Sequence, residues 1–182
     1  RRKLARDPVL GPWVKEIGTI RVPMGEDDPF PYLVRTICYQ QLVGRAASTI
    51  HSRLVEALSG EVTTRKVLRV RESTLRKAGL SHAKCAAIRD LASKISVGDV
   101  VVSDLSEQSD REVIRRLVQV RGIGVWTAQM YLMFRMHRPD IWPTGDLGVR
   151  KGFAKAHGLK VPPSASELEG LGQAYIPWRS AA

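Results

Sequence analysis

Residues 120–130 read VRGIGVWTAQM, and they decide the fold because they join two segments that have helical periodicity. Gly122 and Gly124 flank one apolar residue, and glycine tolerates every backbone angle that a tight turn between helices can demand. The amides of Gly122, Gly124 and Val125 would lie at the start of the second helix. Amides in that position bind phosphate without reading base sequence. The stretch therefore predicts a helical hairpin that holds a phosphate backbone.

A glycine pair of this kind is also typical of an ordinary corner in an all-α protein, so composition is needed to choose. The 182 residues include 29 Lys and Arg against 18 Asp and Glu, which gives a net charge of +11. This balance favours a polyanionic partner over an uncharged one, although a generically basic soluble protein would share it. A hydrophobic content of 43% is enough for a core in one or two small lobes.

Cysteine usage and hydropathy exclude several classes of protein. Cys38 and Cys85 each lie in an apolar helical stretch, which indicates buried reduced thiols and neither a disulfide scaffold nor a four-cysteine iron–sulfur cluster. No apolar run is long enough for a membrane span, and no signal peptide is recognisable. We expect an intracellular protein without a membrane partner. The chain begins without Met and ends at PWRSAA, which leads us to expect a fragment of a longer chain.

Periodicity and capping residues predict an all-α protein. Asp7 and Pro8 are expected to start the first helix, Ser81 to cap another, and Ser109 with Glu112 to form a capping box before the hairpin. The expected helices cover about residues 8–18, 32–43, 46–58, 82–95, 110–118, 125–136 and 147–157, with one more inside 161–178.

Five ordered segments carry a resemblance to a known family. They are ICYQQLVGRAASTI (37–50), GLSHAKCAAIRDLA (79–92), VRGIGVWTAQMYLMF (120–134), RPDIWPTGDLGVRKGF (138–153) and PWRS (177–180). In this order and spacing they resemble the helix-hairpin-helix (HhH-GPD) DNA glycosylase superfamily, and most closely its 3-methyladenine (AlkA-type) branch. The resemblance spans about residues 7–180.

The resemblance implies one glycosylase unit over residues 1–182, with two helical lobes and an active-site cleft between them. We expect residues 30–105 to form the lobe with the wedge loop and 106–158 to carry the hairpin and the catalytic aspartate. Residues 1–29 and 159–182 would complete the other lobe. The β-rich N-terminal lobe of larger relatives would be missing.

The resemblance also assigns the catalytic carboxylate. Asp146 falls on the family's catalytic aspartate, after a loop with Pro143 and Gly145 and at the start of a helix. An ordinary helix N-cap is the alternative, and both roles agree because the helix N-terminus favours the ionised carboxylate. His51, His82, His137 and His157 are scattered and are interpreted as structural or surface residues.

The resemblance also implies which residues recognise the base and which help to flip it out of the duplex. Trp126 stands where strand-nicking relatives carry a Schiff-base lysine, so the resemblance implies no lyase activity and an indole face for a cationic base. Packing beneath the hairpin is the alternative for Trp126. Met130 and Leu147 would line the base pocket in place of aromatic residues of the bacterial alkylation enzyme. Leu42, with Gln41 beside it, would be the wedge that fills the gap in the duplex, unless Leu42 belongs to the core.

The hairpin is expected to contact the DNA backbone and to bind a cation. Gly122, Gly124, Val125 and Thr127 would bind phosphate, and the resemblance implies a monovalent cation, Na⁺ or K⁺, on the carbonyls of the following residues: Val118, Val120 and Ile123. Lys84, Arg121, Arg150 and Lys151 are further candidates for phosphate contacts, or ordinary surface charges.

The sequence thus predicts a monomeric, monofunctional DNA glycosylase that excises alkylated purines from double-stranded DNA, with 3-methyladenine as the first candidate. It would act in the nucleoid or cytoplasm of a bacterium or in a eukaryotic nucleus. A glycosylase for mismatched or oxidised bases is one alternative. A module that binds damaged DNA without catalysis is the other.

Overall fold

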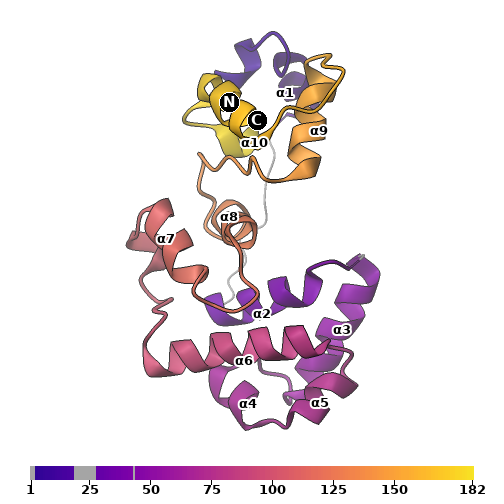
Figure 1. The fold of residues 1–182 in the computed structure, drawn as a ribbon, viewed down its shortest axis with the longest axis vertical. Helices are drawn as coiled ribbons and strands as arrows, with labels where there is room; N and C mark the ends of the chain where they lie inside the picture. Colours follow the sequence, from indigo (N-terminus) through magenta and orange to yellow (C-terminus); the bar gives the residue numbers. More distant parts are fainter. Residues whose placement is uncertain (1–2, 19–27, 43) are drawn as a thin grey trace. The chain divides into compact units, whose positions relative to one another are not determined.

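The computed structural model describes residues 3–18, 28–42 and 44–182, which form helices joined by loops, with no strand among them (Figure 1). The all-α fold class is therefore confirmed. Two compact units divide the chain. We call residues 25–128 the hairpin unit, and residues 1–24 with 129–182 the carboxylate unit. The boundary falls inside helix α8 (Val125–Phe134). It differs from the predicted lobe limit at residue 105, and the hairpin and Asp146 lie in different units.

The hairpin unit contains six helices before α8 among its described residues. They are α2 (Pro29–Tyr39), α3 (Gly44–Ala57), α4 (Thr64–Arg69), α5 (Glu72–Lys77), α6 (His82–Val97) and α7 (Asp110–Leu117), with a 3-10 turn at Leu105–Glu107. Helix α6 lies at the centre of the unit and packs against α2, α4 and α5 (Figure 1). Its face Cys85, Ile88 and Leu91 is fully buried, as are Leu33 and Ile37 of α2. These apolar faces form the core of the unit.

The helix ends in this unit are set mainly by local capping. The Ser81 hydroxyl accepts a hydrogen bond from the Lys84 amide, and Gly98 ends α6 with a left-handed φ of 84°. Ser109 caps α7 as expected. The predicted capping box also needs the Glu112 carboxylate to bind the Ser109 amide, but this carboxylate binds Arg115 and Arg116 instead, at 2.7 and 2.8 Å. The short helices α4 and α5 were not predicted from the sequence.

Two helices begin or end away from their predicted limits. Asp28 caps α2, which ends at Tyr39, four residues before the predicted limit of 43, because the chain turns at Gln40 and Gln41. In the carboxylate unit the Asp7 side chain accepts from the amides of Val9 and Leu10 at 2.9 and 2.8 Å. That turn delays α1 (Gly11–Ile17), which was expected to start at Pro8.

The carboxylate unit is built around a small aromatic core. Its further elements are a 3-10 turn at Leu4–Arg6, α9 (Leu147–Ala156), α10 (Ala165–Leu171) and 3-10 turns at Gly172–Tyr175 and Arg179–Ala181. Trp142, Leu168 and Tyr175 are buried together with Leu4, and the indole N–H of Trp142 donates to the Leu168 carbonyl at 2.8 Å. Gly172 admits this indole, because a Cβ there would lie 2.3 Å from Trp142 Nε1. The core thus fixes Trp142, which begins the loop that leads to Asp146; we call this loop the Asp146 loop.

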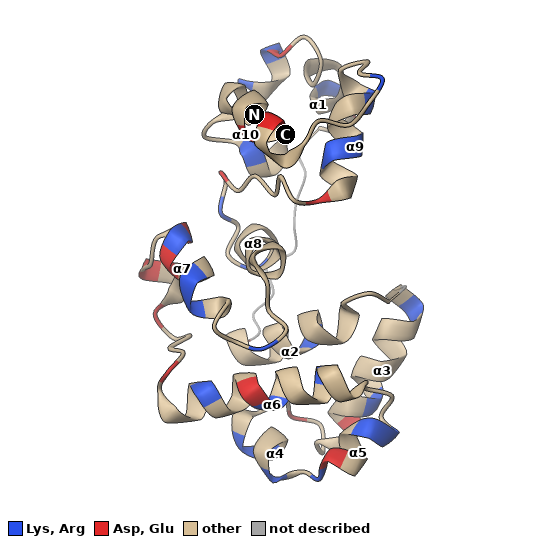
Figure 2. Ribbon diagram, viewed as in Figure 1, with Lys and Arg blue, Asp and Glu red and all other residues tan. Residues whose placement is uncertain are grey.

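No helix among the described residues has the length and apolar character needed to cross a bilayer. Charged residues of both signs lie on α7, whereas α8 carries none (Figure 2).

Candidate active site

The expected hairpin is present between α7 and α8. The Val120 amide donates to the Leu117 carbonyl at 3.1 Å, and the Ile123 amide donates to Val120 at 3.0 Å, so two successive turns reverse the chain. Gly122 has a φ of +78°, and a Cβ there would lie 3.1 Å from Cβ of Ala87 on α6. Both the left-handed backbone and the close approach favour glycine at this position. Val120 and Ile123 are buried and anchor the loop in the unit.

The residues that start α8 divide into exposed and buried ones. Gly124 and Val125 are exposed, and a Cβ on Gly124 would meet no atom within 4 Å, so their amides lie where a phosphate can approach. Thr127 is different, because it is 4% exposed and its hydroxyl accepts a hydrogen bond from Gln40 Nε2 at 3.3 Å. This hydrogen bond gives the hydroxyl a structural role, and the binding of DNA backbone by Thr127 stays a prediction. The hydroxyl supports the hairpin from within.

Trp126 and Met130 lie one helical turn apart on α8, so they share a face of this helix. Trp126 is 45% exposed, and Met130 is partly buried. Packing entirely beneath the hairpin is thereby excluded for Trp126. A tryptophan that is this exposed offers apolar surface of the kind on which a planar base can stack.

The expected wedge loop joins α2 to α3. Gln41 has a φ of 56°, a left-handed conformation that is uncommon outside glycine. The next residue, Leu42, is 39% exposed, which places it outside the core that Leu33 and Ile37 occupy. An exposed leucine that closes a tight turn fits a wedge.

The candidate phosphate contacts differ in what they do. Lys84 is partly buried and its ammonium donates to the carbonyls of Cys38 and Gln40 at 2.7 and 2.8 Å, so it closes the end of α2. Burial lowers the pKa of Lys84. The Arg150 guanidinium likewise donates to the Pro163 carbonyl at 2.6 Å. These two side chains stabilise the fold, whereas Arg121 and Lys151 are exposed.

Asp90 ties the hairpin to α6. Its Oδ2 accepts from the Arg121 amide at 2.7 Å and from Lys94 Nζ at 2.7 Å. Partial burial opposes ionisation, but the hydrogen bonds from Lys94 and from the Arg121 amide outweigh it and lower the pKa of Asp90. The side chain of Arg121 remains at the surface of the loop, where a phosphate can reach it.

Asp146 is the N-cap of α9. Its Oδ1 accepts hydrogen bonds from the amides of Gly148 at 2.6 Å and Val149 at 3.1 Å. The Asp146 amide donates to the Pro143 carbonyl at 2.9 Å, so the loop before the helix is itself a closed turn. The partly buried carboxylate is thus fixed in orientation, and the neighbouring Leu147 is 54% exposed. Amides at a helix N-terminus favour its ionised form.

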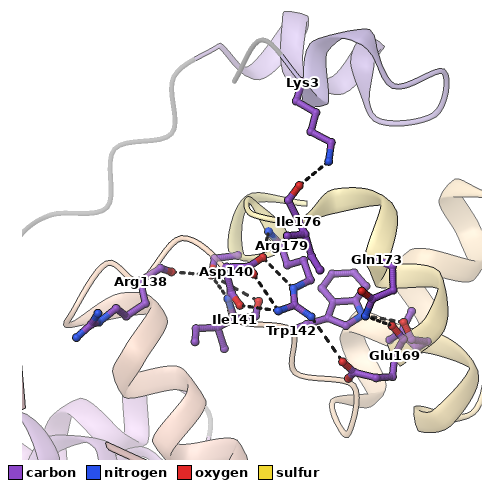
Figure 3. A network of polar contacts seen from close by, with 11 residues as sticks. Lys3, Arg138, Asp140, Ile141, Trp142, Glu169, Gln173, Ile176 and Arg179 are labelled. Atoms are coloured by element: carbon purple, nitrogen blue, oxygen red, sulfur yellow. Dashed lines mark hydrogen bonds and ion pairs between the residues drawn. The ribbon is translucent and has the colours of Figure 1, made fainter. Parts of the chain in front are cut away.

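A network of polar contacts holds the start of the Asp146 loop (Figure 3). The Arg179 guanidinium donates to both carboxylate oxygens of Asp140, at 2.8 and 2.9 Å, and its Nη1 lies 3.5 Å from Glu169. Ser180 accepts from the Ile141 amide at 2.9 Å and donates to the Arg138 carbonyl at 2.7 Å. The segment 177–180, present in the resemblance as PWRS, therefore anchors the chain before Trp142.

Sequence reasoning missed two residues that position the site. Arg179 was quoted within PWRS, but nothing local paired it with Asp140. Gln40 was quoted within the wedge segment, but its contact with Gly122 joins residues far apart in the sequence. The sequence feature that could have drawn attention to Gln40 is the pair of polar residues, Gln40 and Gln41, directly after an apolar helix.

The carbonyls predicted to bind a cation lie in the hairpin. Val118, Val120 and Ile123 fall within one loop, and the Val120 carbonyl accepts a hydrogen bond from Ile123, which leaves a second lone pair for an ion. In the described residues, no cluster of His, Cys, Asp or Glu forms a conventional metal site. The monovalent cation on the three backbone carbonyls stays a prediction. Cys38 and Cys85 are free and buried, in agreement with the reduced thiols expected.

The comparisons agree with this geometry. The pattern of the HhH-GPD superfamily of base excision DNA repair proteins matches residues 34–177, and the chain belongs to this superfamily. DNA-3-methyladenine glycosylase 1 of Schizosaccharomyces pombe is 30% identical over 174 residues, which cover 93% of this chain and 76% of that protein.

Two solved structures of 3-methyladenine DNA glycosylases are similar to this chain over nearly its whole length. The 3-methyladenine DNA glycosylase of Schizosaccharomyces pombe in complex with abasic DNA has a TM-score of 0.87 at 27% identity, over 99% of this chain and 90% of that one. The DNA-3-methyladenine glycosidase of Bacillus halodurans has a TM-score of 0.85 at 30% identity, over 98% and 82%. The resemblance read from the five segments is confirmed at the level of the superfamily and of its 3-methyladenine branch.

Proposed function

We propose that this protein is a monofunctional DNA glycosylase of base excision repair that removes alkylated purines and leaves an abasic site. The observation that carries the proposal is the capped, oriented carboxylate of Asp146 in a chain whose hairpin has Trp126 in place of a nucleophile. The names of the relatives, DNA-3-methyladenine glycosylases, support the same reaction and the same class of base.

The chemistry follows from the carboxylate. Breaking the N-glycosidic bond builds positive charge on the deoxyribose ring, and a fixed carboxylate stabilises that charge while water attacks C1′. A 3-methyladenine or 7-methylguanine already carries positive charge, so it leaves as a neutral base without a second acid. One carboxylate is then sufficient, and Asp146 supplies it.

Trp126 accounts for the absence of strand cleavage in this mechanism. A lyase reaction needs an amine that forms a Schiff base with the sugar, and an indole cannot supply one. The exposed Trp126 face instead attracts a planar, positively charged base through its π-electrons, and Met130 extends the apolar surface along the same face of α8. Leu147 beside Asp146 is a further exposed apolar residue that we assign to the base pocket.

The proposed partner is double-stranded DNA with alkylated bases, bound by a monomer wherever the cell keeps that DNA: the nucleoid or the nucleus. The net charge of +11, the exposed start of α8 and the DNA-bound relative support it. The hairpin carbonyls would hold Na⁺ or K⁺, which brings a positive charge close to a bound phosphate.

Base release from several duplexes tests the proposal. Dimethyl-sulfate-treated DNA, 8-oxoguanine duplexes and mismatched duplexes are incubated with the protein, and the released bases are separated by chromatography. Release of 3-methyladenine or 7-methylguanine alone is the expected result. Release of only an oxidised or mismatched base would assign the protein to the other glycosylase class, and tight binding without release would make it a damage-binding module.

A further inference from the structure

Gln40 joins the wedge loop to the hairpin. Its Nε2 donates to the Gly122 carbonyl at 2.9 Å and to the Thr127 hydroxyl at 3.3 Å. One acceptor lies in the turn of the hairpin, and the other lies in the first turn of α8. A single side chain at the end of α2 thus contacts both parts of the element that we assign to phosphate binding.

The backbone of Gln40 is fixed as well. Its carbonyl accepts from Lys84 Nζ at 2.8 Å, and the same ammonium binds the Cys38 carbonyl at 2.7 Å. Lys84 belongs to α6, whose Ala87 lies against the Gly122 turn, so α6 supports the loop and the hairpin together. Gln40 is therefore held at its main chain by one element and at its side chain by another.

The residues after Gln40 need this support. Gln41 has a φ of 56°, a conformation that a non-glycine residue keeps only when its surroundings impose it. Leu42 follows with 39% of its surface exposed, so burial of its side chain is incomplete. The residue directly before this turn is Gln40, which is held by its own side-chain hydrogen bonds and by the ammonium of Lys84.

We propose that Gln40 is a positioning residue that couples the hairpin to the wedge: it holds the turn at Gln41 so that Leu42 projects in the correct register when the hairpin binds the DNA backbone. This inference rests on the proposed function, because it needs Leu42 to enter a duplex. Gln40 itself touches neither the base nor the sugar in this scheme.

The first test separates binding from opening of the base stack. Gln40→Met keeps the length of the side chain and removes the donor, and Gln119→Met is the matched control at an exposed glutamine between α7 and α8. The probe is a duplex with a tetrahydrofuran abasic-site analogue next to 2-aminopurine, whose fluorescence rises when the stack opens. No base is excised from this probe.

The expected result is a split between two readouts. Affinity of Gln40→Met for undamaged duplex stays within about twofold of wild type, because the charges and the exposed hairpin amides are unchanged. The 2-aminopurine signal falls, and single-turnover release of an alkylated base slows about tenfold, as the loss of two hydrogen bonds suggests. Gln119→Met behaves like wild type. An unchanged fluorescence signal in Gln40→Met would overturn the proposal.

A double-mutant cycle with Leu42→Ala gives a second, independent test. If Gln40 acts through the wedge, Gln40→Met has little further effect once Leu42 is replaced. Rate losses that multiply would contradict the coupling. Should Gln40→Met fail to fold, Thr127→Val removes one acceptor at nearly constant volume and must reduce the fluorescence signal in the same direction.

The two proposals fail in different ways. If wild type opens the abasic-analogue duplex but releases no alkylated base, the proposed function is wrong and the fluorescence cycle still decides the role of Gln40. If wild type releases the base and Gln40→Met opens the stack normally, only the positioning role is wrong.

Discussion

The Gly148 amide donates a hydrogen bond to Asp146 Oδ1 at 2.6 Å, and a Cβ added to Gly148 would lie 3.0 Å from that same oxygen. Gly148 is the second residue of α9, where its amide would otherwise lack a partner within the helix. The contact therefore both caps the helix and fixes the carboxylate. A methyl group at this position must push on the oxygen that we assign to catalysis.

Gly148→Ala is expected to slow base release about tenfold or more, because small displacements of a catalytic group have large effects on rate. The free energy of unfolding should change little, since alanine favours the helix while its Cβ crowds the cap. Gly152→Ala is the matched control on the same helix, where a Cβ meets no atom within 4 Å. Single-turnover kinetics and thermal unfolding of both variants check this, and equal rates would contradict it.

Leu42→Ala should weaken engagement of damaged duplex and slow excision while the melting temperature stays nearly unchanged, because Leu42 is 39% exposed. Leu54→Ala, at a fully buried position of α3, is the contrasting variant and should cost about 2–5 kcal/mol. Calorimetry together with lesion-binding titrations separates the two. A large loss of stability in Leu42→Ala would assign Leu42 to the core.

Trp126→Ala should reduce excision of cationic 7-methylguanine by about 3- to 30-fold, the range expected for the loss of a cation–π contact. Binding to undamaged duplex should change much less. Trp13→Ala removes a tryptophan that is 56% exposed on α1 and should leave excision unaltered. An equal loss in both variants would place the effect in stability and not in base recognition.

Asp140→Asn removes the ion pair with Arg179 that anchors the Asp146 loop, and its effect on the free energy of unfolding should depend on pH. The hydrogen bonds from Arg179 hold the pKa of Asp140 below its ordinary value of 3.8, so the ion pair stabilises the folded state above that pH. At neutral pH the variant should be less stable by about 1–3 kcal/mol. The difference from wild type should shrink as the pH falls below 3.8, because wild type then protonates Asp140 and loses the ion pair that the variant already lacks. Urea unfolding at neutral and acidic pH measures it, and a difference independent of pH would contradict the assignment.

Local signals were enough for much of the fold. Gly122 and Gly124 marked the hairpin, Ser81 marked the start of α6, and Asp146 was placed correctly as the N-cap of α9. Each of these depends on contacts within a few residues, which sequence patterns record. The short helices α4 and α5, of six residues each, were missed because they span too few turns for apolar periodicity to appear.

The roles of some polar side chains could not be predicted, because their partners are distant in sequence. The Thr127 hydroxyl accepts a hydrogen bond from Gln40, and the Lys84 ammonium binds carbonyls at the end of α2; neither contact was predicted from the sequence. The end of α2 was misplaced for the same reason, since its C-cap residue, Gln40, is bound by Lys84 of α6 and by the hairpin. Only the packed structure reveals these pairings.

The most direct measurement is single-turnover base release from an end-labelled duplex with one 7-methylguanine, by wild type, Asp146→Asn and Asp146→Ala, with the strands analysed before and after alkali. Asparagine retains the cap and alanine removes it, so both variants should lose excision while only Asp146→Ala loses about 1 kcal/mol of stability. Wild type should release the base and leave a strand that breaks only in alkali. Breakage without alkali, or release that persists in Asp146→Asn, would contradict the account.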